Sequence, residues 1–207
     1  MIIDLHAHSR PRSDDSDLSP VELILQAKQT GLDGVCVTEH DWHWTDEDIS
    51  RLSRDLDFPI FRGMEISSDE GHLLVFGLGE YKFGMHHAEF IRKLVDEAGG
   101  VIIMAHPYKR QVHYNPEPQE LLEAACHNPV FGLVDALETL NGRSSDKDNN
   151  FALELSRRLA LKGVGGSDAH SFTDIPTCAT EFERRIGSLE ELMTELKAGR
   201  YRAVDLR

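Results

Sequence analysis

Seven short apolar runs, rich in β-branched residues and separated by polar clusters, recur along the 207-residue chain. Most of them are continuously apolar, as in strands of a parallel sheet that is covered on both faces. The runs are Met1–Leu5, Gly34–Thr38, Pro59–Ile66, His72–Gly77, Val101–Ala105, Val134–Leu140 and Gly163–Gly166. The segment between the third and fourth runs is too short for a helix, so we expect a hairpin or an irregular corner there.

Helical stretches with clear start and stop signals lie between most of these runs. Ser19-Pro20-Val21-Glu22 is typical of a capping box with proline at the first helical position, and Gly31 ends that helix. Further helices are expected from Thr45, over residues 86–98 and 146–161, and over residues 188–199. Alternating strands and helices around one core predict an α/β fold, either an open doubly wound sheet or a compact, incomplete barrel.

The charge balance narrows the possible partners. The chain has 22 Lys plus Arg against 36 Asp plus Glu, a formal net charge of −14. Coating duplex DNA or an anionic membrane requires a surplus of basic residues, so neither a membrane nor a stable duplex is expected as a partner. An anionic substrate remains compatible with this charge if bound cations make the site locally positive.

Length and composition fit one globular domain, which we expect over residues 1–207. The three cysteines have neither a disulfide-framework nor a zinc-finger spacing. The N-terminus lacks the apolar stretch of a signal peptide, and no run reaches the roughly 18 apolar residues of a membrane span. The expected location is therefore the cytoplasm.

Metal-ligand side chains stand at the C-terminal ends of several predicted strands. They are His6 and His8, His40, Glu65, His106, and Asp168 and His170, while His72 opens the run that follows Glu65. In a barrel these ends meet at one mouth, where active sites are built. The remaining histidines lack this context and are expected to be surface or hydrogen-bonded residues: His43, His86, His87, His113 and His127.

The spacing within these groups supports a metal site. His6 and His8 are two residues apart, so on an extended chain both imidazoles point the same way, and Asp168 and His170 repeat the spacing. With one glutamate they form a nitrogen and oxygen donor set without sulfur. Such a set favours Mn, Fe or Zn in a hydrolytic site over a structural zinc site.

Six motifs appear in one order along the chain: Asp4-Leu5-His6-Ala7-His8-Ser9, Thr38-Glu39-His40-Asp41, Gly63-Met64-Glu65-Ile66, Gly71-His72, Ala105-His106-Pro107 and Gly166-Ser167-Asp168-Ala169-His170. In this order they resemble the PHP (polymerase and histidinol phosphatase) family of metal-dependent phosphoesterases, in its stand-alone form. The resemblance covers essentially the whole chain, although it is weak over residues 180–203. It implies a distorted seven-stranded (β/α) barrel with the active site at the C-terminal ends of the strands, and two or three divalent metal ions, Mn, Fe or Zn.

The resemblance also implies three ligand groups. The first is His6, His8, Glu65 and Asp168; the second is Glu65, as a bridging ligand, with His72 and His106; the third is an early aspartate with His40 and His170. The stretch that carries the early aspartate is longer than the family pattern. It aligns either Asp15 or Asp14, and we expect Asp15. Asp4, Glu39 and Asp41 are expected to orient the imidazoles.

Basic and aromatic residues near these motifs are candidates for substrate contacts. The segment Glu138–Arg143 resembles the strand and turn that present an arginine to the substrate phosphate, so Arg143 is expected to bind phosphoryl oxygens, with a turn-capping surface residue as the alternative. Lys109, Arg110 and His113 are candidates for a second anion contact. Trp42 and Trp44 are candidates for base stacking or for covering the site, or they anchor their loop.

The expected reaction is hydrolysis of a phosphate mono- or diester by metal-activated hydroxide. Three divalent cations would outweigh Asp15, Glu65 and Asp168, so the site would be positive inside an acidic protein. Glu65, His170 and Arg143 are the expected catalytic residues. The expected substrate is a nucleotide, a nucleoside bisphosphate or the end of a short oligonucleotide. The alternatives are a histidinol-phosphate-type phosphatase, an amidohydrolase-like C–N hydrolase, and a regulatory domain without activity.

Overall fold

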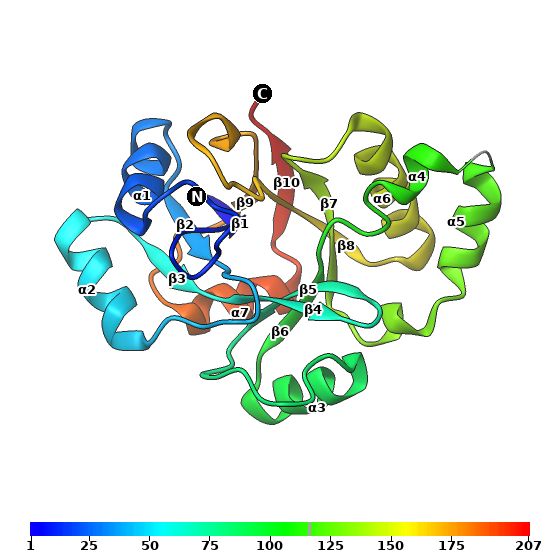
Figure 1. Cartoon of the computed structure of the whole chain (residues 1–207), viewed down its shortest axis with the longest axis horizontal. Coiled ribbons are helices and arrows are strands. Elements are labelled where there is room, and N and C mark those ends of the chain that lie inside the picture. The colour runs from blue at the N-terminus through cyan, green and yellow to red at the C-terminus, as the bar shows by residue number, and fades with distance from the viewer. Residues whose placement is uncertain (116) are drawn as a thin grey trace.

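Two five-stranded sheets lie side by side in the computed structural model of the chain (Figure 1). The structure describes residues 1–115 and 117–207, and the side chains of His113 and Tyr114 lie outside the described part, so the expectations for His113 do too. The first sheet has the strand order β10-β9-β1-β2-β3 and the second has the order β4-β5-β6-β7-β8. The strands are β1 (Ile2–Ala7), β2 (Gly34–Val37), β3 (Ile60–Arg62), β4 (Met64–Ser68), β5 (Gly71–Phe76), β6 (Val101–Met104), β7 (Ala136–Asn141), β8 (Lys162–Gly166), β9 (Cys178–Phe182) and β10 (Tyr201–Asp205).

The prediction of a distorted seven-stranded (β/α) barrel is wrong, because the strands form two separate mixed sheets of five strands each. The third apolar run divides at Gly63 into β3, which belongs to the first sheet, and β4, which belongs to the second. A Cβ atom at Gly63 would lie 2.7 Å from the Phe76 ring, so only glycine fits this close crossing. Strands β9 and β10, which were not predicted, extend the first sheet as an antiparallel edge next to β1.

Parallel pairing, as the continuous apolar runs predict, occurs in both sheets. Strands β1, β2 and β3 pair in parallel in the first sheet, and β6, β7 and β8 pair in parallel in the second. The predicted hairpin is confirmed, because β4 and β5 pair antiparallel through the tight turn at Asp69-Glu70. Strand β6 also runs antiparallel to β5, so the second sheet is mixed.

Helices cover the outer faces of the two sheets. Helices α1 (Pro20–Gln29) and α2 (Asp46–Leu56) pack on the first sheet, and α3 (Ala88–Ala98), α5 (Pro118–Cys126) and α6 (Asp146–Leu159) pack on the second (Figure 1). A third apolar cluster between the sheets joins residues of both to α7 (Leu189–Ala198). The short helices α4 (Gln111–Tyr114), η1 (Pro129–Gly132) and η2 (Phe172–Asp174) lie in the connections.

The residues predicted to start helices form hydrogen-bonded N-caps. Ser19 accepts a hydrogen bond from the backbone N–H of Glu22, and the Glu22 side chain accepts one from Ser19, which completes the predicted capping box of α1. Ser145 and Asp148 make the same reciprocal pair at the start of α6. Within the described part of the chain, no helix is both long and apolar enough to cross a membrane.

Glycines in β8 allow the two sheets to meet. A Cβ atom at Gly165 would lie 2.3 Å from the Ala179 carbonyl oxygen of β9, and one at Gly166 would lie 2.5 Å from the His6 Cβ of β1. The Thr180 hydroxyl adds hydrogen bonds to both the N–H and the C=O of Gly165. The C-terminal ends of β1 and β8 are therefore held against each other although they do not form a ladder.

Replacing Gly165 by alanine tests this contact. The added methyl group must displace the backbone of β9, so we expect Gly165→Ala to lower the free energy of unfolding by about 3 kcal/mol. Gly132→Ala is the control, because a Cβ atom there meets no atom within 4 Å; its stability should stay within about 0.5 kcal/mol of the wild type. Equal stability of both variants in urea unfolding would contradict the close approach of the sheets.

Candidate metal centre

The C-terminal ends of strands from both sheets converge on one region, and every predicted ligand residue lies there. Backbone contacts set this convergence. The His8 N–H donates to the Ala169 carbonyl oxygen at 3.0 Å, and the Asp168 N–H donates to the His6 carbonyl oxygen at 2.7 Å. A single parallel bridge between His40 and Glu65 joins the end of β2 to β4. The barrel prediction is wrong, but the meeting of strand ends on which the site prediction rested is present.

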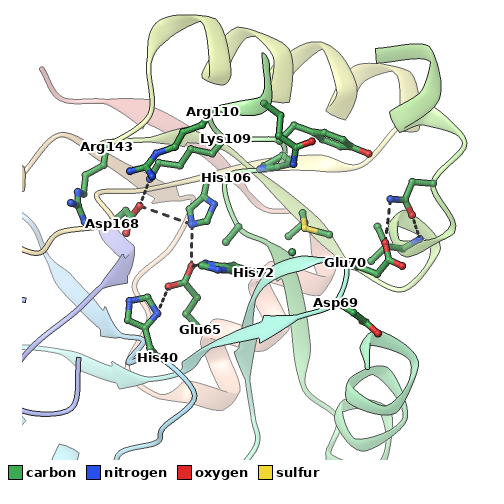
Figure 2. A pocket seen from close by; sticks show the side chains of 18 of the residues that line it. His40, Glu65, Asp69, Glu70, His72, His106, Lys109, Arg110, Arg143 and Asp168 are labelled. Carbon is green, nitrogen blue, oxygen red and sulfur yellow. Dashed lines mark hydrogen bonds and ion pairs between the residues drawn. The ribbon is translucent and has the colours of Figure 1, made fainter. Parts of the chain in front are cut away.

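Glu65 is the centre of the cluster. Its carboxylate is buried and lies among the imidazoles of five histidines, of which Figure 2 shows His40, His72 and His106. Oε2 lies 3.4 Å from His6 Nε2, 3.2 Å from His8 Nε2 and 3.0 Å from His40 Nδ1, whereas Oε1 lies 2.9 Å from His72 Nδ1 and 3.0 Å from His106 Nε2. One carboxylate thus contacts members of every predicted ligand group, as a bridging ligand must.

Three buried polar atoms at this centre suit a cation. His6 Nε2, His8 Nε2 and Glu65 Oε2 are each inaccessible to solvent and make no hydrogen bond within the described part of the chain. Leaving such atoms unpaired is costly. The other ring nitrogens are used, since His6 Nδ1 lies 3.0 Å from Glu138 Oε1 and His8 Nδ1 lies 3.2 Å from Ser13 Oγ. Two imidazole nitrogens and one carboxylate oxygen converging within 4.8 Å of one another can hold a divalent metal.

Two further groups adjoin this one. Glu65, His72 and His106 have donor atoms within the same 4.8 Å limit, and so do His6, His106 and Asp168. These sets share members, so ions bound in them would be neighbours.

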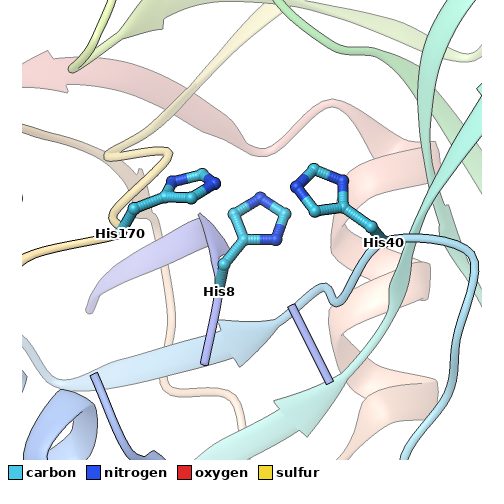
Figure 3. A group of neighbouring side chains, drawn as sticks. All are labelled: His8, His40 and His170. Carbon is cyan, nitrogen blue, oxygen red and sulfur yellow. The ribbon is translucent and has the colours of Figure 1, made fainter. Parts of the chain in front are cut away.

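The third predicted group gathers around Asp15. Asp15 Oδ2 lies 3.0 Å from His170 Nε2 and 3.5 Å from His40 Nε2. Figure 3 shows the His40 and His170 rings on either side of His8, which brings this group next to the first. Asp14 is exposed and makes no ion pair within the described residues, so the geometry favours Asp15 over Asp14.

Burial and neighbouring charges shift the pKa values of these groups. Burial alone would raise the pKa of Glu65, but the surrounding His6, His106 and His40 outweigh it and hold that pKa well below its usual range. Asp168 behaves alike, since His6 and Lys109 overcome the effect of burial and lower its pKa. Burial lowers the pKa of His8 to about 4, so its ring is neutral near pH 7, which is the state that ligates metals.

Glu138 is a site residue whose role the sequence reasoning missed. Its carboxylate is buried; Oε1 accepts from His6 Nδ1, while Oε2 accepts from the His106 backbone N–H and the Asn141 side chain, both at 2.9 Å. It therefore orients one ligand ring and the backbone of another ligand. Its position within the predicted strand run Val134–Leu140, where burial is expected, was a signal that could have identified it.

The expected roles of three other acids need correction. Among the described residues, Asp4 and Asp41 hydrogen-bond to no imidazole: Asp4 accepts from the backbone of His6 and Ser167, and Asp41 accepts from the backbone of Ser67. Burial raises the pKa of Asp4 to about 6. Glu39 does support a ligand ring, but only through the Ser13 hydroxyl.

The predicted substrate contacts line a pocket of about 620 Å³ beside the cluster (Figure 2). Lys109, Arg110 and Arg143 all face it. Lys109 Nζ lies 2.6 Å from Asp168 Oδ2 and 3.3 Å from Asn141 Oδ1, so its charge already contacts a predicted ligand. The guanidinium groups of Arg110 and Arg143 make no ion pair within the described residues and remain free for an anion.

The loop after β6 has a strained backbone. His106, Tyr108 and Arg110 have φ angles of 27°, 60° and 68°, and Asp168 after β8 has a φ of 56°. Non-glycine residues rarely adopt such angles, and where they do the strain is commonly found at functional sites. Of these four residues, His106 and Asp168 are predicted ligands and Arg110 is cationic, and all three line the pocket.

The two tryptophans anchor their loop rather than line the pocket. Trp44 Nε1 donates to Glu39 Oε1 at 3.0 Å, and the Arg12 guanidinium stacks 3.9 Å above the Trp42 ring. Neither ring belongs to the lining of the pocket. This arrangement favours loop anchoring over base stacking.

Comparisons with known proteins agree with the geometry. Residues 146–201 match the family model PHP_C, described as PHP-associated. The chain is 28% identical over 165 residues to the uncharacterized protein MJ1587 of Methanocaldococcus jannaschii, covering 74% of this chain and 90% of that protein.

Two solved structures share the fold. One is a two-domain protein from Bacteroides vulgatus containing a predicted PHP-like metal-dependent phosphoesterase, with a TM-score of 0.68 and 18% identity over 99% of this chain and 64% of that one. The other is an amidohydrolase from Chromobacterium violaceum, with a TM-score of 0.52 and 18% identity over 81% of this chain and 87% of that one. At this identity they support the fold alone.

Glu138→Gln tests the support of His6. The amide keeps the size of the side chain but loses the charge, and its NH2 group accepts no hydrogen bond, so either His6 Nδ1 or the His106 N–H and Asn141 lose their acceptor. We expect metal affinity, measured by titration, to fall about 10- to 100-fold. Glu154→Gln, on the exposed face of α6, should bind metal like the wild type. Unchanged affinity in Glu138→Gln would remove Glu138 from the site.

The low pKa of His8 gives a second prediction. In the metal-free protein at pH 5.5 the His8 ring should be neutral with its proton on Nδ1, because its pKa is about 4 instead of the usual 6.5. Long-range ¹⁵N–¹H NMR of ¹⁵N-histidine-labelled protein reports both features. A positively charged His8 at that pH would contradict the described burial.

Proposed function

Because the chain is a PHP-family protein whose nitrogen and oxygen ligands adjoin a pocket that Lys109, Arg110 and Arg143 line, we propose that it is a metal-dependent hydrolase of phosphate mono- or diesters. The observation that carries the proposal is the convergence of His6 Nε2, His8 Nε2 and Glu65 Oε2, buried and unpaired, at the edge of this pocket. In this proposal the ligands are His6, His8, Asp15, His40, Glu65, His72, His106, Asp168 and His170.

Divalent Mn, Fe or Zn, when bound, would lower the pKa of a coordinated water and polarise the phosphoryl group. The protein residues have separate tasks. Glu65 bridges the ligand groups, and His170 joins the third group through Asp15. Arg143 and Arg110 are placed to bind phosphoryl oxygens in the forked geometry that guanidinium groups favour.

Lys109 lies between the ligands and the pocket. Its contact with Asp168 keeps a positive charge at the edge of the cluster, within reach of an anion that enters the pocket. We propose that it binds a second phosphoryl oxygen. The strained loop from His106 to Arg110 holds the lysine in this direction.

The net charge of −14 supports small substrates. Long duplexes would be repelled by the acidic surface, whereas a nucleotide, a nucleoside bisphosphate or the end of a short strand can reach the local positive charge of the pocket. A histidinol-phosphate-type monoester satisfies the same requirement and belongs in the same substrate panel.

A C–N hydrolase is the second candidate, since one solved structure of this fold is an amidohydrolase. A C–N hydrolase site of this kind would be recognised by a carbamylated lysine as the bridging metal ligand. Here Glu65 takes the central position, and the lysine lining the pocket, Lys109, is paired with Asp168 and Asn141. Three cationic side chains at the pocket also fit a phosphate ester better than a neutral amide.

The test is a substrate panel on metal-depleted protein reloaded with Mn, Fe or Zn. It comprises p-nitrophenyl phosphate, its bis ester, nucleoside bisphosphates, short oligonucleotides and histidinol phosphate, with dipeptides and ureides for the second candidate. We expect phosphate-ester turnover only after reloading. Turnover of the amides alone would replace this proposal with the second candidate, and turnover of nothing after full loading would overturn it.

Two matched pairs of variants test the assigned residues. Arg143→Ala should lower kcat/KM on the best ester about 100-fold, because a pre-positioned charge on the phosphoryl oxygens is lost; the control is Arg157→Ala, on the exposed face of α6. Asp15→Asn should lower both bound metal and turnover, while Asp14→Asn should leave both unchanged. The reverse result for the aspartates would move the ligand to Asp14.

A further inference from the structure

Ser13 occupies a junction between two of the ligand groups. Its side chain is buried, and its Oγ lies 3.2 Å from His8 Nδ1, 2.6 Å from Glu39 Oε2 and 3.3 Å from the His40 backbone nitrogen. His8 belongs to the first ligand group and His40 to the third. One hydroxyl therefore touches a member of each.

The direction of these hydrogen bonds follows from the chemistry of the partners. A serine hydroxyl has one hydrogen, and the Glu39 carboxylate can only accept, so that hydrogen points to Glu39. Ser13 Oγ must then accept from the His8 Nδ1–H and from the His40 N–H. This fixes the proton of His8 on Nδ1 and leaves its buried Nε2 with a free lone pair.

Glu39 holds Ser13 and the neighbouring segments in place through hydrogen bonds. Its carboxylate is fully buried and accepts hydrogen bonds from the Ser9 backbone and hydroxyl and from Trp44 Nε1, in addition to Ser13. Ser9 follows His8 directly and Trp44 follows His40 by a few residues. The segments that carry the two ligands are thus attached to one carboxylate.

The loop that carries Asp15 is attached at the same point. The Ser13 N–H donates to the Ser9 carbonyl oxygen at 2.9 Å, and the Ser13 carbonyl accepts from Ser16 at 3.2 Å, so Asp15 lies within a turn that begins at Ser13. Asp15 then reaches His170 and His40. Displacement of Ser13 would move a ligand of the third group and release a ring of the first.

We propose that Ser13 is a shared positioning residue that couples ion binding at the Asp15, His40 and His170 group to ion binding at the His6, His8 and Glu65 group. The proposal rests on the metal sites of the proposed function. Loss of its hydroxyl changes both groups, whereas loss of the Asp15 carboxylate changes only one.

Metal binding without substrate tests the coupling. Wild type, Ser13→Ala, Asp15→Asn and the double variant are titrated with Mn²⁺, and bound ions are counted after dialysis. Asp15→Asn should lose one ion per chain and bind the others normally. Ser13→Ala should lose the same ion and also bind the remaining ions about 10-fold or more weakly. The double variant should bind the remaining ions about 10-fold or more weakly than Asp15→Asn does.

A control and a second readout separate positioning from general destabilisation. Ser19 is a nearby serine that caps α1 and contacts no predicted ligand among the described residues. Ser19→Ala should lower the melting temperature without changing metal affinity. In metal-free Ser13→Ala, NMR should show that His8 no longer holds its proton only on Nδ1. Remaining ions that bind as in Asp15→Asn, or an equal effect of Ser19→Ala on affinity, would overturn the proposal.

The outcome is independent of catalysis. A chain that shows the coupling but hydrolyses no phosphate ester would leave Ser13 in this role and remove the proposed reaction. A chain that hydrolyses esters but shows no coupling would do the opposite. A wild-type chain that binds no ion would overturn both.

Discussion

The buried carboxylate of Glu65 is the interaction on which the site depends. A carboxylate removed from water requires compensating partners, and here those partners are imidazoles from four different segments of the chain. The requirement acts in both directions, because among the described residues the carboxylates near His6 Nε2 and His8 Nε2 are those of Glu65 and Asp168. A bound cation satisfies all of these groups together, which makes metal binding the simplest account of their burial.

The two-sheet fold supplies the positions that this cluster needs. Gly63 lets the chain cross from one sheet to the other directly before Glu65, and the glycines of β8 let that strand approach β1 closely enough for Asp168 to meet His6. The supporting side chains differ between the two central histidines: His6 contacts Glu138 directly, whereas His8 contacts Glu39 through Ser13. The second arrangement connects neighbouring ligand groups.

The ligands could be predicted from sequence because they follow apolar runs at fixed spacings, and strand ends gather whether or not the sheet closes. Whether the strands close into one barrel could not be predicted, since this depends on how β8 meets β9. Strand β9 carries Thr180 and other residues without a distinctive pattern. Glu138 was hidden in a motif interpreted for Arg143. Asp4 and Asp41 accept hydrogen bonds from Ser167 and Ser67, which are distant in sequence, so no local spacing specifies these partners. The ion pair of Lys109 with Asp168 could not be predicted for the same reason, because the two residues are far apart in sequence.

The acidic composition of the chain and the basic side chains of the pocket have different roles: the net charge of −14 disfavours large polyanions, and Lys109, Arg110 and Arg143 favour small ones. Acidic residues also line the pocket, so in the proposed function its positive charge depends on ions bound at Glu65. Anomalous diffraction from Mn-soaked crystals tests this most directly. We expect a peak about 2.0–2.2 Å from His6 Nε2, His8 Nε2 and a Glu65 oxygen. Full occupancy of Mn elsewhere, with no peak among these three atoms, would contradict the metal centre.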